Sequence, residues 1–304
     1  MENSQEMDSP LVTIAIPTYN RAESYLRGVI SSALGQTYEH LEVIIGDNAS
    51  TDATPAVIAE VEDQRLRHLR HSENIGANGN FNRLLEEATG DWFLLLHDDD
   101  LIDAEFVESC LSARKPDTDY GFIRTGVRAI DAKGRILKES PNRVTGNRPE
   151  DFYRSWFRAR TGLFLCNTLY STRALREIGG FHSLHHLLED NYALVRILAD
   201  RPWLDIPEVR ASYRYTYDQR SYQVPVREWC EDFKGLLEMI VAQTEDRHKA
   251  EIQQIGNRFF GQLCVRRANA IASPRKRAMA RLTVARHFGW SNLRSTWALQ
   301  RSPK

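Results

Sequence analysis

The chain has 304 residues, of which 42% are hydrophobic and 27% charged, and its formal net charge is −1. This composition excludes a disordered protein and leaves room for one large domain or two modest ones. The N-terminal segment MENSQEMDSP has no basic stretch followed by an apolar one, and no apolar run approaches membrane-spanning length, so neither a signal peptide nor a transmembrane helix is expected.

Three short apolar runs dominate the first hundred residues: VTIAI, LEVIIG and WFLLL, at 12–16, 41–46 and 92–96. None of them alternates with polar residues, which is typical of strands buried on both faces of a parallel sheet. Segments with helical spacing of apolar residues, and one further short run, RLRHLR, lie between them. This alternation of strands and helices predicts an α/β fold with a doubly wound, mainly parallel sheet flanked by helices.

The elements after the third strand differ in kind. DAEFVESCLSAR reads as a helix with Asp103 at its N-cap, and YGFIRTGVRAIDAKGRILKE as two strands joined by a turn at 131–134. The glycine pair at 179–180 ends one helix, and a second helix finishes near residue 200. From about Val226 onward the pattern is helical almost throughout, which predicts a helical C-terminal extension.

Each of the three strong strands ends in a polar cluster. The carboxyl ends of parallel strands share one edge of the sheet, where open α/β sheets bind ligands. We therefore expect the three clusters to form a single site. They are Pro17 to Arg21, Asp47 to Ser50 and Asp98 to Asp100.

The acidic triplet Asp98 to Asp100 predicts a metal site. Adjacent carboxylates repel one another by several kcal/mol at about 4 Å unless a cation or strong donors offset their charge. Oxygen ligands at a strand end suit Mg²⁺ or Mn²⁺, which are commonly held by one or two carboxylates together with substrate phosphates. The ordinary alternative is a solvated turn in which one aspartate caps the next helix.

Tyr19 and Asp47 suggest a pocket for a nucleobase. An aromatic face can stack on a base, and a carboxylate can accept a hydrogen bond from a base N–H. The structural alternatives are edge packing for Tyr19 and an Asx turn for Asp47. The chain contains neither GxGxxG nor GxxxxGK[ST], so neither the dinucleotide fingerprint nor the P-loop accounts for this sheet.

Five segments occur together in a recognisable order: IPTYNR, VIIGDNASTD, ENIGANGNFN, GDWFLLLHDDD, and IGGF followed by LLED. In these segments the chain resembles the nucleotide-sugar-dependent glycosyltransferases of family 2, whose fold is called GT-A. The resemblance implies a GT-A catalytic domain over residues 1–225, with a nucleotide-sugar half at about 10–115 and an acceptor half at about 116–225. A basic helical region then occupies residues 226–304.

The resemblance also implies roles for residues of the nucleoside pocket. Pro17, Tyr19 and Asp47 are expected to line this pocket, and Asn74 is expected to lie near it. Relatives often have an arginine where this chain has Phe81.

Further roles concern the metal and the chemistry. The resemblance implies that Asp98 faces the ribose or the metal and that Asp99 is the principal ligand of Mn²⁺ or Mg²⁺. His97 stands where many relatives have the first aspartate of an Asp-x-Asp motif. Asp190, in the late Glu-Asp pair, is expected to be the catalytic base. The alternative for Glu189 and Asp190 is a pair of acids interacting with a helix dipole.

These expectations combine into an inverting, metal-dependent glycosyltransferase. It would move a sugar from a nucleoside diphosphate, with UDP favoured, to a hydroxyl of a glycan or lipid-linked acceptor in surface polysaccharide or glycoconjugate synthesis. One alternative is a sugar nucleotidyltransferase, although PTYNR is a poor version of that class's Gly-rich phosphate loop. Another is a non-catalytic nucleotide- or glycan-binding module, which intact Asp99 and Asp190 disfavour.

The C-terminal region is strongly basic. Eleven of the 40 Lys and Arg residues and none of the 41 Asp and Glu residues fall within 252–304, so residues 1–251 carry −12. Tryptophan beside arginine is typical of a helix lying on anionic lipid. A helix packed on the catalytic domain or on a second subunit is the alternative, and nucleic acid is not expected. The helical face in question is made by Trp290, Leu293 and Trp297, with Arg294 and Arg301 beside it.

The location of the protein follows from its cysteines and this basic region. The four cysteines are far apart and form no C-x-x-C pair, which argues against a zinc site or a disulfide framework. A reducing cytoplasm is expected, with peripheral association at the inner face of a membrane as an option that depends on the C-terminal region.

Overall fold

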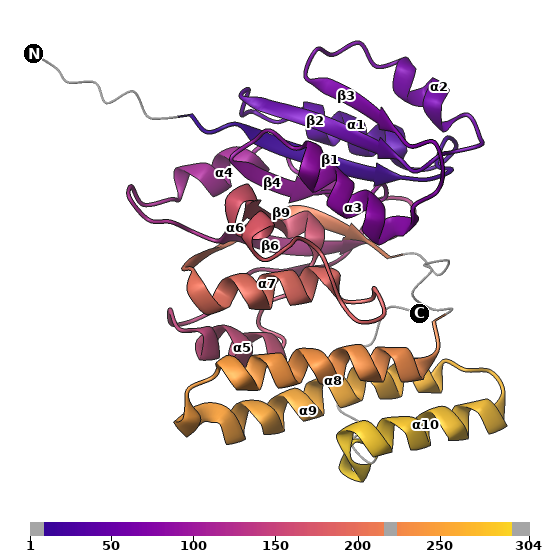
Figure 1. Ribbon diagram of the computed structural model, residues 1–304, viewed down its shortest axis with the longest axis vertical. Helices are drawn as coiled ribbons and strands as arrows, with labels where there is room; N and C mark the ends of the chain where they lie inside the picture. Colours follow the sequence, from indigo (N-terminus) through magenta and orange to yellow (C-terminus); the bar gives the residue numbers. More distant parts are fainter. Residues whose placement is uncertain (1–8, 216–223, 294–304) are drawn as a thin grey trace, which may run out of the picture.

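The computed structural model describes residues 9–215 and 224–293 as a mixed sheet flanked by helices, with a layer of three long helices beneath it (Figure 1). The strands are β1 Val12–Thr18, β2 Leu41–Asp47, β3 Leu66–Arg70, β4 Trp92–Leu95, β5 Leu101–Ile102, β6 Phe122–Ile130, β7 Ile136–Ser140, β8 Thr168–Ser171 and β9 Trp203–Arg214. The helices are α1 Leu26–Leu34, α2 Thr54–Ala59, α3 Gly76–Glu87, α4 Phe106–Ser112, α5 Pro149–Phe157, α6 Thr172–Glu177, α7 Glu189–Asp200, α8 Val226–Gln243, α9 Asp246–Asn269 and α10 Pro274–Phe288, with short 3₁₀ turns η1 Leu165–Asn167 and η3 Trp290–Leu293.

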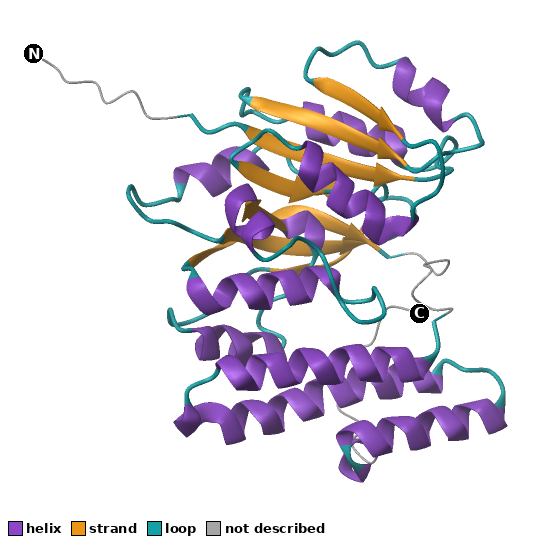
Figure 2. Ribbon diagram, in the orientation of Figure 1, coloured by secondary structure: helices purple, strands orange, loops and turns teal. Residues whose placement is uncertain are grey.

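The sheet has the strand order β3-β2-β1-β4-β8-β6-β9-β5, with β7 paired to β6. The four strands β3, β2, β1 and β4 are parallel, and the arrowheads of β1, β2 and β3 point to the same side in Figure 2. The predicted α/β class, with a sheet flanked by helices, is confirmed, and the sheet as a whole is mixed. The later strands are mixed in direction, since β8 is antiparallel to β4 and β6, while β9 is parallel to β6.

Both faces of β1 are buried, which explains why its apolar run does not alternate. Ile14 and Ile16 belong to the core that includes Val29 of α1, and Ala15 belongs to the core that includes Leu84 of α3. Burial on both faces is the condition that favours continuous apolar runs in parallel sheets. The helices on the two sides of the sheet therefore follow directly from the strand composition.

The N-cap predicted at Asp103 is wrong. Helix α4 begins at Phe106, with Glu105 preceding it and no side-chain cap. The carboxylate of Asp103 instead accepts two hydrogen bonds from the Arg128 guanidinium of β6, at 3.0 and 2.8 Å. A bidentate pair with arginine is stronger than a single bond to a backbone N–H, so this contact prevails over the local capping pattern.

The C-terminal helices pack against the preceding helices α5 and α7 through one apolar cluster. Helices α8, α9 and α10 lie side by side. Phe233 of α8 and Phe260 of α9 share a core with Trp156 of α5 and Leu194 of α7. The predicted helical extension is therefore confirmed as far as residue 293.

The four cysteines are buried and free. No helix in the described ranges is long and apolar enough to cross a bilayer.

Candidate active site

The exit of β1 is bound to the exit of β2. Asn20 adopts a left-handed backbone conformation, with φ of 53°, which asparagine tolerates better than most residues. Its N–H donates to Ser50 Oγ at 2.9 Å, and its Oδ1 accepts from Thr51 N at 2.8 Å. Beside it, the Tyr19 side chain is 44% exposed. The turn thus presents an aromatic face at the edge of the sheet, next to the β2 exit.

Pro17 lies just beyond the point where the pairing of β1 with β4 ends. Leu96 N donates to Ala15 O at 2.9 Å, so Ala15 faces β4, and Pro17, two residues on, faces the same side. Proline has no N–H to donate to a neighbouring strand. The pairing of β1 with β4 ends at Ala15, while its pairing with β2 continues to Thr18. The edge of the sheet is therefore open between the β1 and β4 exits.

Asp47 ends β2 with its side chain fully buried. Its Oδ1 accepts a hydrogen bond from Ser50 N at 2.8 Å. Its Oδ2 lies 3.5 Å from both His68 Nε2 and Arg70 Nε, and it accepts no hydrogen bond from any residue in the described ranges. A buried acceptor without a donor is costly. This oxygen therefore keeps acceptor capacity beside His68 and Arg70.

Asn74 is held against the β2 exit. Its Oδ1 accepts from Asn48 Nδ2 at 3.0 Å and from Gly76 N at 2.9 Å. Asn48 Oδ1 in turn accepts from Ile75 N at 2.9 Å. Asn74 thus shapes the chain that leads into α3 beside Asp47, and its side-chain oxygen already has two donors.

Asp98 is paired with the exit of β1. Its Oδ1 lies 3.4 Å from Arg21 Nε, and this contact ties the β4 exit to β1. Burial raises the pKa of Asp98, while Arg21 acts in the opposite direction. With the contacts of Asn20, this ion pair brings all three polar clusters to one edge of the sheet.

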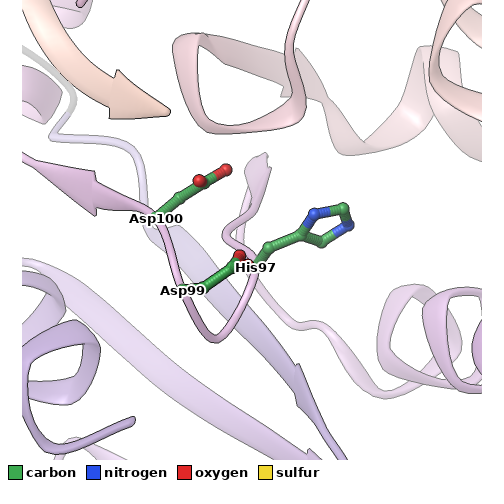
Figure 3. Close-up of side chains that lie close together, drawn as sticks. All are labelled: His97, Asp99 and Asp100. Carbon is green, nitrogen blue, oxygen red and sulfur yellow. The ribbon is translucent and has the colours of Figure 1, made fainter. Parts of the chain in front are cut away.

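The residues on either side of Asp98 form a separate group. Asp100 N donates to His97 O at 3.2 Å, which closes a β-turn over residues 97–100. As a result, one potential ligand atom from each of His97, Asp99 and Asp100 lies within 4.8 Å of the others (Figure 3). The structure thus gathers Asp99 with His97 and Asp100, and Asp98 faces Arg21.

This group fits a divalent cation. Burial, and to a smaller extent the charge of Asp99, raises the pKa of Asp100 to about 7. A bound cation would stabilise the ionised form of this buried carboxylate. One imidazole nitrogen and two carboxylate oxygens can together ligate a divalent cation. Arg214 of β9 stabilises this turn through two hydrogen bonds. Its backbone N–H donates to Asp100 Oδ1 at 2.9 Å, and its side-chain Nε donates to Asp99 O at 2.7 Å. Sequence reasoning missed Arg214 because β9 itself was not predicted.

Asp190 lies in the first turn of α7, after a loop anchored to α3. Phe181 N donates to Asn82 Oδ1 at 2.8 Å, and Asn82 Nδ2 donates back to Phe181 O at 3.0 Å. Gly180 has a φ of 82° and an added Cβ would lie 2.3 Å from Asn82 Oδ1, so glycine is required there.

The environment of Asp190 suits a base. Burial, and to a smaller extent the charge of Glu189, raises the pKa of Asp190 to about 6, whereas the Asn191 N–H and His97 lower it. His97 also lowers the pKa of Asp100, so its ring acts electrostatically on both carboxylates. A carboxyl with a pKa near 6 is ionised at neutral pH yet more basic than an ordinary aspartate.

Comparison with known proteins identifies the family. The profile of Glycosyl transferase family 2 matches residues 13–179, which include the exits of β1, β2 and β4. The chain belongs to this family. This family assignment and the GT-A fold expected from the resemblance are both confirmed.

Sequence relatives of this glycosyltransferase match about half of its length. The putative glycosyltransferase EpsH of Bacillus subtilis is 27% identical over 167 residues, 54% of this chain and 48% of the relative. A GalNAc(5)-diNAcBac-PP-undecaprenol beta-1,3-glucosyltransferase of Campylobacter jejuni is 31% identical over 134 residues, 43% of this chain and 42% of the relative. The chain spans about half the length of the curated relatives it matches.

Solved structures are similar over nearly the whole chain. Residues 1–349 of S. aureus TarS in complex with UDP-GlcNAc give a TM-score of 0.64 at 17% identity, and the match covers 91% of this chain and 89% of that 1–349 chain. The mannosyltransferase PcManGT of Pyrobaculum calidifontis, in complex with GDP-Man and Mn²⁺, gives 0.58 at 18% identity, covering 93% and 82%. At these identities the likeness concerns the fold.

Proposed function

We propose that this family 2 glycosyltransferase is an inverting, metal-dependent enzyme that uses a nucleoside diphosphate sugar. The observation that carries the proposal is the junction of three strand exits at one edge of the sheet, through Asn20 to Ser50 and Arg21 to Asp98. An exposed tyrosine, a buried carboxylate oxygen without a hydrogen bond and the His97, Asp99 and Asp100 group follow these strand ends and support the proposal.

The donor site is proposed to run along this edge. Tyr19 stacks on the base, and Asp47 Oδ2 accepts a hydrogen bond from a ring N–H. Uracil and guanine have such a ring N–H, whereas adenine and cytosine do not. Of the two bases that fit, we propose uracil, with UDP as the donor nucleotide. Pro17 lines the pocket and Asn74 holds its wall. In this division of the chain, about 10–115 binds the nucleotide sugar, about 116–225 meets the acceptor, and 226–304 is the basic helical C-terminal region.

Transfer is proposed to take place in one displacement. A divalent cation bound by Asp99, together with His97 and Asp100, would stabilise negative charge on the leaving diphosphate. Asp190 accepts the proton of the acceptor hydroxyl while that oxygen forms a bond to the anomeric carbon. The bond from this carbon to the diphosphate breaks with its electron pair on the leaving group, so the configuration inverts. The acceptor is a hydroxyl of a glycan or lipid-linked saccharide, in synthesis of a polysaccharide or glycoconjugate.

Product analysis tests this reaction class. Incubation with UDP-, GDP-, ADP- and CDP-sugars, Mn²⁺, and free or polyprenyl-phosphate-linked oligosaccharides is expected to release a nucleoside diphosphate, with UDP-sugars preferred. Release of pyrophosphate from a nucleoside triphosphate and a sugar phosphate would instead identify a nucleotidyltransferase. Binding of a nucleotide sugar without turnover of any acceptor would favour the non-catalytic module.

The basic C-terminal region is proposed to rest on an anionic membrane surface. Along α10, Arg275, Met279, Leu282 and Arg286 share one helical face and are all exposed, with Met279 exposed by 71%. Neither arginine forms an ion pair with any residue of 9–215 or 224–293. Trp290, which is 63% exposed, borders an adjacent groove of about 450 Å³. Apolar side chains flanked by unpaired cations favour anionic lipid.

Part of the expectation for this region concerns residues outside the described ranges, namely Arg294, Trp297 and Arg301.

The exposed face of α10 allows a separate test of membrane binding. Met279→Glu is expected to weaken flotation with phosphatidylglycerol vesicles about tenfold, because it replaces an inserted apolar side chain by an anion. Ile136→Glu, at another exposed apolar position, is the matched control and should float as the wild type does. Equal flotation of all three proteins, or flotation that does not need anionic lipid, would contradict the proposal.

A further inference from the structure

The loop between Phe181 and α7 is held by a residue of the C-terminal helices. Asp232 of α8 accepts three hydrogen bonds from this loop. Its Oδ1 accepts from His185 N at 2.9 Å, and its Oδ2 accepts from Ser183 Oγ at 3.0 Å and from Leu187 N at 3.3 Å. Ser183 Oγ itself accepts from Leu187 N at 3.1 Å and from Leu188 N at 3.3 Å. One carboxylate thus organises the turn that leads to Asp190.

Asp232 is fully buried, and no cationic side chain of the described residues forms an ion pair with it. A buried carboxylate without a cation needs strong donors to offset the loss of hydration. Here the donors all come from the loop, so carboxylate and loop depend on each other. The family profile ends at residue 179, and this contact therefore lies beyond the part of the chain that it matches.

Asp232 also holds the first turn of α7 through its backbone. Tyr192 Oη donates to Asp232 O at 3.0 Å, and Tyr192 N donates to Leu188 O at 2.9 Å. A Cβ at Gly235 would lie 2.6 Å from Tyr192 Oη, so glycine at this position leaves room for the hydroxyl. Contacts to α8 therefore secure the chain on both sides of Asp190.

We propose that Asp232 is a positioning residue that fixes the 183–188 loop and, through it, the direction of the Asp190 carboxylate. The catalytic part of this inference rests on the proposed function. Asp232 touches neither the candidate metal group nor the nucleotide pocket, so its loss is expected to affect the proton-accepting step and leave donor binding intact. Misplacing a catalytic group by about 1 Å can reduce the rate about 100-fold.

The direct test is Asp232→Asn, which keeps the size of the side chain but replaces one acceptor oxygen by a donor. Amide hydrogen exchange in 183–188 is expected to be at least about tenfold faster than in the wild type, because local opening becomes easier. Turnover is expected to fall about 10- to 100-fold, with an unchanged Kd for UDP. Glu238→Gln, an exposed acid on the same helix whose contact is with Lys234 at 3.8 Å, is the matched control.

Two further variants separate positioning from general destabilisation. Tyr192→Phe removes only the hydroxyl, leaves the ring packed, and is expected to lower turnover several-fold with donor affinity kept. Ser183→Ala and Asp232→Asn are expected to be non-additive in turnover, because the two side chains act as one unit.

Unchanged exchange in 183–188 of Asp232→Asn overturns the proposed contact. Faster exchange with unchanged turnover overturns the role of Asp232 in positioning Asp190. Equal losses of turnover and of UDP affinity also overturn that role. If the wild-type protein transfers no sugar, the proposed function fails, and the exchange measurement still decides whether Asp232 holds the loop.

Discussion

Asp190→Asn is expected to lower turnover by about 10²- to 10⁴-fold, the usual contribution of a general base. The amide has the same size but cannot accept the proton of the acceptor hydroxyl. Because Asp190 is proposed to act on the acceptor hydroxyl and not on the nucleotide, the Kd for UDP should stay within about twofold of wild type. Steady-state kinetics and calorimetric titration with UDP measure the two quantities.

The pH dependence of wild-type turnover provides an independent check on this base. Since burial raises the pKa of Asp190 to about 6, the base is protonated and inactive below that pH. Turnover should therefore fall about tenfold per pH unit on the acid side. Asp200→Asn, at the exposed opposite end of α7, should keep both the rate and this profile. Undiminished turnover in Asp190→Asn would rule out its role as base.

Stability distinguishes this variant from a folding defect. The folded protein binds the Asp190 proton more tightly than the unfolded chain does, because the folded pKa lies above the usual 3.8. Ionised Asp190 therefore lowers the free energy of unfolding above about pH 6. This loss of stability is absent below the usual pKa of 3.8, where Asp190 is protonated in both states. Asp190→Asn should melt at or above the wild-type Tm at pH 7. A large loss of stability would show that the activity change has another cause.

Asp99→Ala is the second change with a large expected effect. It removes the carboxylate that joins His97 and Asp100 in the candidate metal group. The Mn²⁺-dependent part of UDP affinity is expected to weaken at least about 100-fold, since loss of electrostatic support for a phosphate is of that order. Affinity measured in EDTA should not change, because the base pocket at Asp47 is intact. Asp246→Ala, an exposed acid 95% accessible at its side chain, is the control.

Two outcomes would contradict the assignment of Asp99. Equal stimulation of UDP binding by Mn²⁺ in Asp99→Ala and wild type would place the cation elsewhere. A loss of affinity that is the same in EDTA and in Mn²⁺ would mean that Asp99 shapes the pocket without holding a metal.

The part of the site on the parallel strands could be predicted from sequence because local signals and topology agree there. Uninterrupted apolar runs identify β1, β2 and β4, and parallel pairing forces their polar ends to one edge. Thr18, the neighbour of Tyr19, pairs with Asp47 for that reason, although the two paired residues are far apart in the sequence. From sequence, the metal is expected on Asp99 and Asp98, whereas the group in the structure is His97, Asp99 and Asp100, because a four-residue turn brings its first and last residues together.

The remaining features depend on long-range contacts that leave little local signal. The strand β9 contains Pro207 and charged residues and pairs with β6 across register shifts, so its sequence does not read as a strand. Arg214 reaches the acidic turn only because of that pairing. Asp103 has a good capping position, but Arg128 competes for it from another strand. The contact of Asp232 with the loop before Asp190 joins residues 45 or more positions apart.

The central claim is that the exits of β1, β2 and β4 surround one nucleoside diphosphate and its cation. Hydrogen exchange of the wild-type protein with and without UDP and Mn²⁺ tests this claim most directly. We predict slower exchange together in 18–21, 47–51 and 97–101 when both are present, with a smaller effect at 97–101 when Mn²⁺ is omitted. Protection of only one of these segments, or protection confined to another part of the chain, would contradict the account.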